Sequence, residues 1–218
     1  LGMGKPGLDL RIAGGLGGVD SAAPSFAMWQ ISRIVRNSPA LTQEFDAGIG
    51  GLEARLLAID DPAFNTAFSS LLDLHGSRGP NEWELRSQTW ETNPELALAL
   101  IDRMRLAADD QDPQIHHQKA KERSSTALSE LRTMISGDET SAGTLEIAVT
   151  SSSVFIPARE NAKTAIVKVV HEVRLAALEL GRRLAEDGRL EDQRHIFMLQ
   201  DKELEEAIAG NMTKEASD

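Results

Sequence analysis

The sequence predicts an all-α fold, an irregular multi-helix bundle with one short extended segment near the C-terminus. Alanine and leucine, two strong helix formers, make up 53 of the 218 residues. Proline follows Asp or Asn at 61–62, 93–94 and 112–113, a signature of helix N-termini. Apolar residues recur at three- and four-residue intervals, the spacing of a helix with one buried face. Together these observations favour helices packed on helices over a sheet.

The composition excludes several classes of function. The formal net charge is −11, from 23 Lys and Arg against 34 Asp and Glu. Because an acidic surface repels phosphate backbones and no basic block stands out, we expect no nucleic-acid partner. We also expect no membrane partner, since no run approaches the roughly 20 apolar residues that cross a bilayer. The absence of cysteine excludes disulfides and thiolate chemistry and agrees with a cytoplasmic location.

The first half of the chain predicts a series of helices after a glycine-rich start. Residues 1–20 are expected to form a linker, and residues 21–209 a single helical domain that is a piece of something longer. Capping residues and apolar periodicity place helices at 22–36, at 41–59 with a break around Gly48 to Gly51, and at 62–75, 94–109 and 113–136.

The second half is dominated by a long helix at 158–187, closed by Gly188. Residues 141–156 fit either a strand or a helix, and we favour the helix. Residues 196–199 predict the short extended segment, a last helix follows from Asp201, and 210–218 are expected to be disordered. On a helical wheel, the core side of the long helix holds Ala162, Ile166, Val169, Val170, Val173, Ala177, Leu180 and Leu184.

Arg159, Glu160 and Lys163 form the candidate catalytic group. Arg159 falls within the apolar side of the long helix, and Lys163 lies one turn further on, three residues from Glu160. A guanidinium and an ammonium one turn apart can bind phosphate oxygens, and the carboxylate can accept a hydroxyl proton or hold the lysine. The alternative is a solvated pair between Glu160 and Lys163 on a turn that projects beyond the core.

His75, Arg78 and Glu82 form the candidate substrate-binding group. They belong to a turn-rich segment, 75–85, which directly follows an apolar helix and also contains two glycines, a proline and Trp83. Such a concentration of polar side chains is typical of a loop that lines a ligand. In the alternative interpretation, Arg78 pairs internally with a nearby glutamate and Trp83 fills the core.

No metal site is predicted. His116 and His117 are adjacent, so on a helix their rings diverge by about 100° and cannot chelate one ion. A metal hydrolase that uses either histidine is therefore the weakest hypothesis. The sequence signatures of phosphate-binding loops, zinc peptidases and serine hydrolases do not occur in the chain.

Five segments occur in one order within residues 70–208. They are His-Gly-Ser-Arg-Gly-Pro-Asn-Glu at 75–82, Trp-Glu-Thr-Asn-Pro at 90–94, Arg-Glu-Asn-Ala-Lys at 159–163, Glu-Leu-Gly-Arg-Arg-Leu at 179–184 and Ile-Phe-Met-Leu at 196–199. In this order they resemble the helical central region of phosphoenolpyruvate-synthase-like phosphotransferases, a group that includes rifampicin phosphotransferase.

The resemblance implies a three-part enzyme. An ATP-grasp domain, which uses ATP and Mg²⁺, phosphorylates a histidine on a swivelling domain, and that domain carries the phosphoryl group to an acceptor on the helical part. The implied partners are these two domains, neither of which we find in the 218 residues, and a small-molecule acceptor. The family's Arg-Glu-x-x-Lys group near the acceptor hydroxyl corresponds to 159–163, and an apolar acceptor would contact walls such as Met28, Trp29 or Phe64.

Two functions follow from these observations. The first is the acceptor-binding helical domain of a phosphotransferase, which holds no cofactor and is not catalytic alone. The alternative is a non-catalytic helical interaction or scaffold module, favoured by the acidity and by the missing catalytic motifs. The placement of Arg159 separates them, because a guanidinium in a concave pocket supports the enzyme and one in solvent supports the scaffold.

Overall fold

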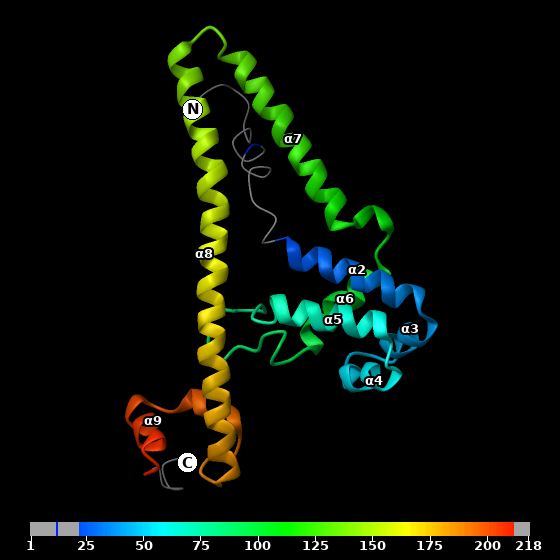
Figure 1. Ribbon diagram of the computed structural model, residues 1–218, viewed down its shortest axis with the longest axis vertical. Helices are drawn as coiled ribbons and strands as arrows, with labels where there is room; N and C mark the ends of the chain where they lie inside the picture. The colour runs from blue at the N-terminus through cyan, green and yellow to red at the C-terminus, as the bar shows by residue number, and fades with distance from the viewer. Residues whose placement is uncertain (1–11, 13–21, 212–218) are drawn as a thin grey trace. The chain divides into compact units, whose positions relative to one another are not determined.

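The computed structural model describes residue 12 and residues 22–211. None of these residues lies in a β-strand, which confirms the predicted all-α class. The predicted linker, apart from Ile12, and most of the predicted disordered tail lie outside the described residues. The described elements (Figure 1) are α2 (Ala23–Asn37), α3 (Pro39–Asp46), α4 (Leu52–Ile59), α5 (Pro62–His75), α6 (Glu95–Leu106), η2 (Asp109–Gln111), α7 (Pro113–Met134), α8 (Glu139–Glu186), η3 (Gln193–Met198) and α9 (Asp201–Ile208).

Contacts divide the chain into two compact units. Among the described residues, unit 1 comprises Ile12, 22–75 and 94–164, and unit 2 comprises 76–93 and 165–211. Helix α8 contributes residues to both units. No sequence pattern indicated this subdivision, and the single domain expected over 21–209 stays a prediction.

Side-chain caps explain where three helices begin. Ser38, Asp61 and Asp112 each accept backbone N–H bonds from the following turn, and each precedes a proline at the first helical position. Asn93 does not act in this way, because its side-chain amide donates to Gln88 and α6 begins without a side-chain cap. The capping signature therefore predicted the helix starts well, although one of its residues has another role.

Helix α2 forms the centre of unit 1. It packs against α3, α5, α6 and the start of α7 (Figure 1). Where the glycine break was predicted, Gly48 and Gly51 have φ angles of +104° and +68°, and the Arg55 guanidinium binds the carbonyl oxygens of Gly48 and Gly50. The unit 1 core includes Met28, Ile31, Val35, Leu41, Phe45, Leu52, Leu56, Phe64, Leu71, Leu98 and Ile101.

Helix α7 leads to the turn at 135–138, and the first part of α8 runs back from it in roughly the opposite chain direction (Figure 1). Arg132 on α7 donates to both carboxylate oxygens of Glu146 on α8, at 2.7 and 2.9 Å. On α7 only Ser124 and Ala127 are buried among the described residues. This part of unit 1 therefore depends less on a core than the helices around α2 do.

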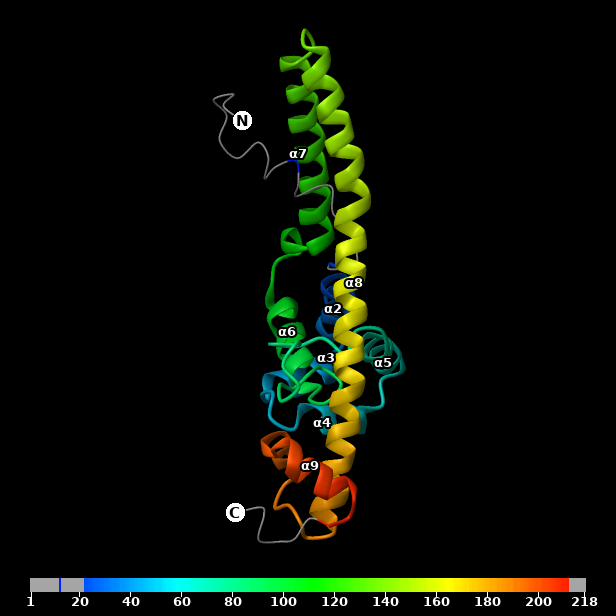
Figure 2. The same cartoon turned by 90° about the vertical axis from the view of Figure 1, so that its left-hand side faces the viewer.

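In unit 2 the end of α8 packs beside η3 and α9 (Figure 2). Leu184, Leu190, Ile196 and Ala207 form its buried apolar cluster. A Cβ atom on Gly181 would lie 2.0 Å from the carbonyl oxygen of Gln193, so the approach of α8 to η3 requires glycine.

Two predictions of secondary structure are settled by the long helix and the segment after it. The ambiguous residues 141–156 are helical and join the predicted 158–187 helix in the single 48-residue helix α8, with Pro157 inside it. The predicted short extended segment at 196–199 is wrong, because Ile196 to Met198 end the 3₁₀-helix η3. Asp192 caps η3 by accepting the N–H of Arg194 at 2.7 Å, and the resulting turns bury Ile196.

The predicted core side of α8 is correct at Ala177, Leu180 and Leu184, which pack in the apolar cluster of unit 2, and wrong in the preceding turns. Ile166, Val169 and Val173 expose 51, 64 and 49% of their surface. The buried side carries Arg174 instead, at 1% exposure. Carbonyl oxygens of the segment 76–93 need hydrogen-bond donors, and Arg174 provides them. The side of α8 that carries Arg174 therefore faces this segment.

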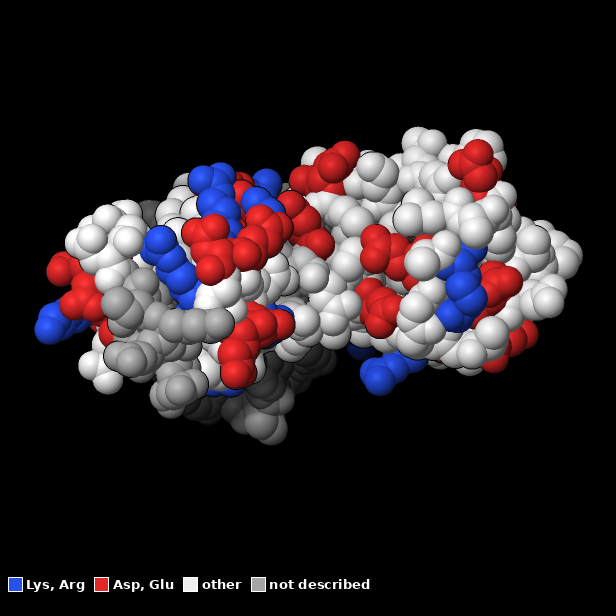
Figure 3. All heavy atoms as spheres, turned by 90° about the horizontal axis from the view of Figure 1, so that it is seen from below, with Lys and Arg blue, Asp and Glu red and all other residues white. Residues whose placement is uncertain are grey.

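Charges on the described surface are mixed. The face seen in Figure 3 carries acidic and basic side chains next to one another, without one large basic area. No helix in the described part of the chain has the length and apolarity needed to cross a membrane.

Candidate functional site

The predicted catalytic group lies on α8 within unit 1. The Arg159 side chain is 78% exposed and donates to the adjacent Glu160, whose side chain is 21% exposed. Lys163 lies one turn further along and is half-buried. The structure thus brings these side chains onto one stretch of helix surface, outside both cavities described below. Arg159 lies in solvent, the placement that the scaffold hypothesis expects.

The predicted substrate-binding group is divided between the two units. His75 ends α5 in unit 1 and is half-buried, whereas Arg78 and Glu82 belong to the loop 76–93 of unit 2. Arg78 Nε lies 2.8 Å from Glu82 Oε2, and these side chains are only 20% and 10% exposed. The internal pair of the alternative interpretation is therefore confirmed. Trp83 does not fill the core, however, because half of its surface is exposed.

Arg174 on α8 holds the loop 76–93 in place. Its Nε donates to the carbonyl oxygen of Leu85 at 3.1 Å, and its Nη2 donates to those of Glu82 and Glu84 at 3.0 Å each. Burial lowers the pKa of the Arg174 guanidinium, and attraction to Glu84 opposes this shift. The hydrogen bonds satisfy a cation that would otherwise be costly to bury.

His171 joins the same buried network, one turn before Arg174. Because a guanidinium can only donate, His171 Nδ1 accepts from Arg174 Nη1 at 3.0 Å. The ring hydrogen therefore lies on Nε2, which donates to Glu91 Oε2 at 2.9 Å. A carboxylate and a histidine in this arrangement can serve catalysis, but His171 is only 3% exposed. We therefore assign the His171–Glu91 pair a structural role, which is to hold the loop 76–93 against α8.

Backbone contacts close the loop 76–93 on itself. Trp90 N–H donates to the Arg78 carbonyl at 2.8 Å, and Glu91 N–H donates to the Gly76 carbonyl at 3.0 Å. A Cβ on Gly79 would lie 2.7 Å from the carbonyl oxygen of Gln88, so the two sides of the loop approach as only glycine allows. The loop is a fixed corner of unit 2.

An apolar groove lies between α4 and α5 in unit 1. Its cavity volume is about 290 Å³. The rings of Phe64 and Phe68 stack along it with their centroids 5.4 Å apart. The lining residues are Glu53, Leu56, Leu57, Phe64, Asn65, Phe68, Ser69 and Leu72. Apolar walls with a few polar groups are typical of small-molecule sites.

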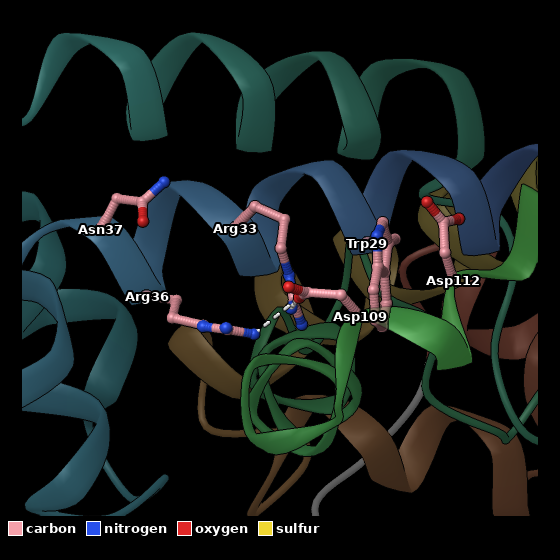
Figure 4. A pocket seen from close by; sticks show the side chains of 6 residues that line it. All are labelled: Trp29, Arg33, Arg36, Asn37, Asp109 and Asp112. Atoms are coloured by element: carbon pink, nitrogen blue, oxygen red, sulfur yellow. Dashed lines mark hydrogen bonds and ion pairs between the residues drawn. The ribbon is translucent and has the colours of Figure 1, made fainter.

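A second cavity, of about 350 Å³, lies beside α2 in unit 1 (Figure 4). Arg33 and Arg36 both reach Asp109 Oδ1, at 2.8 and 2.9 Å, and Arg33 also lies over the Trp29 ring, 3.9 Å from its centroid. Arg33 donates to the carbonyls of Met104 and Ala107 at the end of α6 as well. These hydrogen bonds satisfy the last carbonyl groups of α6. We therefore assign Arg33 and Arg36 a structural role, in which they join α2 to the end of α6.

The adjacent histidines of α7 point to different surroundings. His117 packs its ring edge-on against Phe26, with the centroids 5.8 Å apart, and His116 is exposed. Within the described residues, no three His, Asp or Glu side chains converge as a metal site would require.

Sequence reasoning missed Arg174, His171 and Glu91. One signal could have found them, because Val167, His171 and Arg174 follow the four- and three-residue spacing of a buried helix face. The more apolar side of the same helix is the stronger sequence signal for a core, and it obscures the polar side.

The described elements are all helical, with the braced loop in unit 2 and the apolar groove in unit 1. The chain belongs to the family of the rifampicin phosphotransferase fourth domain, whose model matches residues 4–160. This match confirms the resemblance predicted from the sequence. It includes the loop 76–93, Arg159 and Glu160 and ends before Lys163. A comparison with curated proteins finds no match.

Proposed function

We propose that this chain is the acceptor-binding helical domain of a phosphotransferase and does not catalyse transfer alone. The observation that carries the proposal is membership of the rifampicin phosphotransferase fourth-domain family over 4–160. In this proposal an ATP-grasp domain, with ATP and Mg²⁺, loads a histidine on a swivelling domain. That domain then delivers the phosphoryl group to an acceptor on the helical domain, in the cytoplasm.

The α4–α5 groove is our proposed acceptor site. Its aromatic and aliphatic walls can contact an apolar part of an acceptor, and Asn65 and Ser69 offer hydrogen bonds at its edge. Phe64, one of the walls expected from the sequence, lines this groove. Of the other two, Trp29 lines the α2 cavity and Met28 is buried.

Arg159 and Lys163 are proposed to stabilise the charge of the phosphoryl group in transit, with Glu160 orienting Arg159 or accepting a proton. An arginine that is 78% exposed can meet a phosphohistidine brought by another domain. Its effect on the reaction would depend on that domain excluding water, since charges act more strongly in a dry site.

Transfer by this chain joined to its ATP-grasp and phosphohistidine domains tests the proposal. With rifampicin and ATP, Phe64→Ala should raise KM several-fold, while Arg159→Ala and Lys163→Ala should lower kcat by roughly a hundredfold or more. Arg182→Ala, an exposed arginine further along α8, is the matched control and should leave both constants unchanged. Near wild-type rates for the Arg159 and Lys163 variants would remove their catalytic assignment, and no transfer to any apolar acceptor would remove the function.

A non-catalytic interaction module is the second candidate function. The exposure of Arg159 favours it, because a solvated guanidinium with no cavity beside it among those described has no bound acceptor to serve. Calorimetric titration of the 218-residue chain with rifampicin distinguishes the two. Binding that Phe68→Ala weakens supports the acceptor domain, and no binding at solubility-limited concentration supports the interaction module.

A further inference from the structure

The polar side chains of the α4–α5 groove give it a negative character. Glu53, Asn65 and Ser69 are its polar members, and none of the described residues that line it is basic. Glu53 lies in the first turn of α4 and is half-buried. Its carboxylate makes no ion pair with any residue that the structure describes. A charge beside apolar walls is screened less than one in open water, so this carboxylate attracts a cation more strongly.

Asn65 adds a hydrogen-bond acceptor to the groove. Its side-chain nitrogen donates to Asp60 Oδ1 at 3.0 Å. Because a carboxylate only accepts, this bond identifies the nitrogen end of the Asn65 amide and leaves the carbonyl oxygen able to accept from a ligand. The same bond keeps the Asp60 carboxylate next to a residue of the groove. The polar groups at the edge therefore favour a ligand that donates hydrogen bonds.

Basic side chains of the two wall helices do not neutralise this charge. Arg55, the single basic residue of α4, donates to Glu44 Oε2 at 2.8 Å and to the carbonyl oxygens of Gly48 and Gly50. Helix α5 contains neither lysine nor arginine. The negative charge of Glu53 is thus left for a ligand to balance.

We infer that the acceptor held by this groove is an apolar amine, a small molecule whose protonated nitrogen pairs with Glu53. Leu57, which is 63% exposed, and the half-buried Leu72 would contact its apolar body. An apolar acid would instead bring its carboxylate next to that of Glu53, and this repulsion selects against it. The inference rests on the proposed acceptor site and adds the class of molecule that the site prefers.

Three probes with one skeleton test the inference on the 218-residue chain. Phenylbutylamine, phenylbutanol and phenylbutyrate carry a cation, a neutral hydroxyl and an anion on the same apolar body. Their dissociation constants are measured by NMR titration at low salt. The amine should bind about fivefold more tightly than the alcohol, or better, and the acid should bind more weakly than either.

Substitutions at the groove locate the preference. Glu53→Gln should bring the amine and the alcohol within about twofold of one another, and Glu53→Lys should make the acid the preferred probe. Phe68→Ala should weaken the amine and the alcohol alike, because it removes a wall that both would share. Glu139→Gln is the matched control, since Glu139 also lies in the first turn of a helix but does not line the groove. It should leave the order of the probes unchanged.

The outcomes separate this inference from the proposed function. Equal binding of the amine and the alcohol, weakened by Phe68→Ala, would overturn the inference and leave the acceptor site in place. An amine preference that survives Glu53→Gln, with helix content intact by circular dichroism, would also overturn it, because the net charge of −11 would then explain the attraction.

Binding of no probe up to its solubility limit would overturn both the inference and the acceptor site. If the amine binds with the expected dependence on Glu53, the inference holds as a statement about binding. Absence of phosphoryl transfer to any apolar acceptor by the joined enzyme would in that case remove the proposed function alone.

Discussion

A single guanidinium, that of Arg174, supports the loop 76–93. It satisfies three carbonyl oxygens and one imidazole nitrogen at once. The planar fork of arginine can donate in several directions, which the single ammonium of a lysine at this depth could not reproduce. The residues that the sequence singled out in this loop, Arg78 and Glu82, depend on Arg174 for their setting, because it binds the carbonyl of Glu82 itself.

Arg174→Met should destabilise unit 2 by about 3 kcal/mol, since it leaves one buried and two part-buried carbonyl groups without their donor. Urea unfolding followed by circular dichroism measures this. Arg182→Met, which removes an exposed arginine from the same helix, should cost less than about 1 kcal/mol. Equal unfolding midpoints for the two variants would show that the loop does not rely on the buried guanidinium.

Gly181→Ala should destabilise the protein by roughly 1–3 kcal/mol, because the new methyl group would lie 2.0 Å from the Gln193 carbonyl oxygen. Gly143 is the matched control on the same helix, where a Cβ meets nothing within 4 Å. Gly143→Ala should instead raise the stability by about 0.5–1 kcal/mol through helix propensity. Thermal unfolding compares them, and an equal effect of both changes would contradict the close approach of α8 and η3.

At the scale of elements, the sequence predicts what is local. The helix starts after Asp61 and Asp112 follow from caps that involve only neighbouring residues. The orientation of α8 could not be predicted in this way. It depends on carbonyl groups 89 to 92 residues earlier in the chain, whose position no periodicity reveals. Aliphatic periodicity therefore identified the buried side at the end of α8, around Leu184, but not at Val169 and Val173.

Pro157 interrupts the hydrogen bonding of α8, because proline has no N–H to donate to the carbonyl of Ser153. Pro157→Ala should restore that bond and stabilise the surrounding turns by about 1–3 kcal/mol. Slower hydrogen exchange of amides in the neighbouring turns would register the gain. Pro113→Ala, at the first position of α7, should give no such gain, since the N–H there has no helical acceptor. Unchanged exchange around position 157 would argue against a continuous α8.

Glu179 near the end of α8 should titrate unusually low. Hydrogen bonds from Arg182 and Arg183 lower its pKa from 4.5 to about 2. Since the pKa is lower in the folded state, this contribution to stability is complete above pH 4.5 and is lost as the pH falls towards 2. A carboxyl NMR titration should show the low midpoint, and Arg182→Gln with Arg183→Gln should return it towards 4.5. An ordinary midpoint in the unmodified chain would contradict these hydrogen bonds.

At the scale of the whole molecule, unit 2 is assembled from two separate segments. Residues 76–93 come from the first half of the chain, and residues 165–211 follow much later. The family match spans the first of these segments and stops at 160, before the second. A resemblance confined to the matched residues therefore includes the loop but not the side chains that hold it.

This division has a consequence for truncation. A polypeptide cut after residue 160 keeps every carbonyl of the loop and loses the guanidinium and the imidazole that bind them. We expect trypsin to cleave such a fragment rapidly at Arg78 and Arg86, while the full chain resists. Mass spectrometry of the digests measures this, and adding the peptide 161–218 in trans should slow cleavage. Equal resistance of both forms would show that the loop folds without its distant anchor. Expression boundaries for this family are therefore better placed by three-dimensional packing than by the limits of sequence similarity.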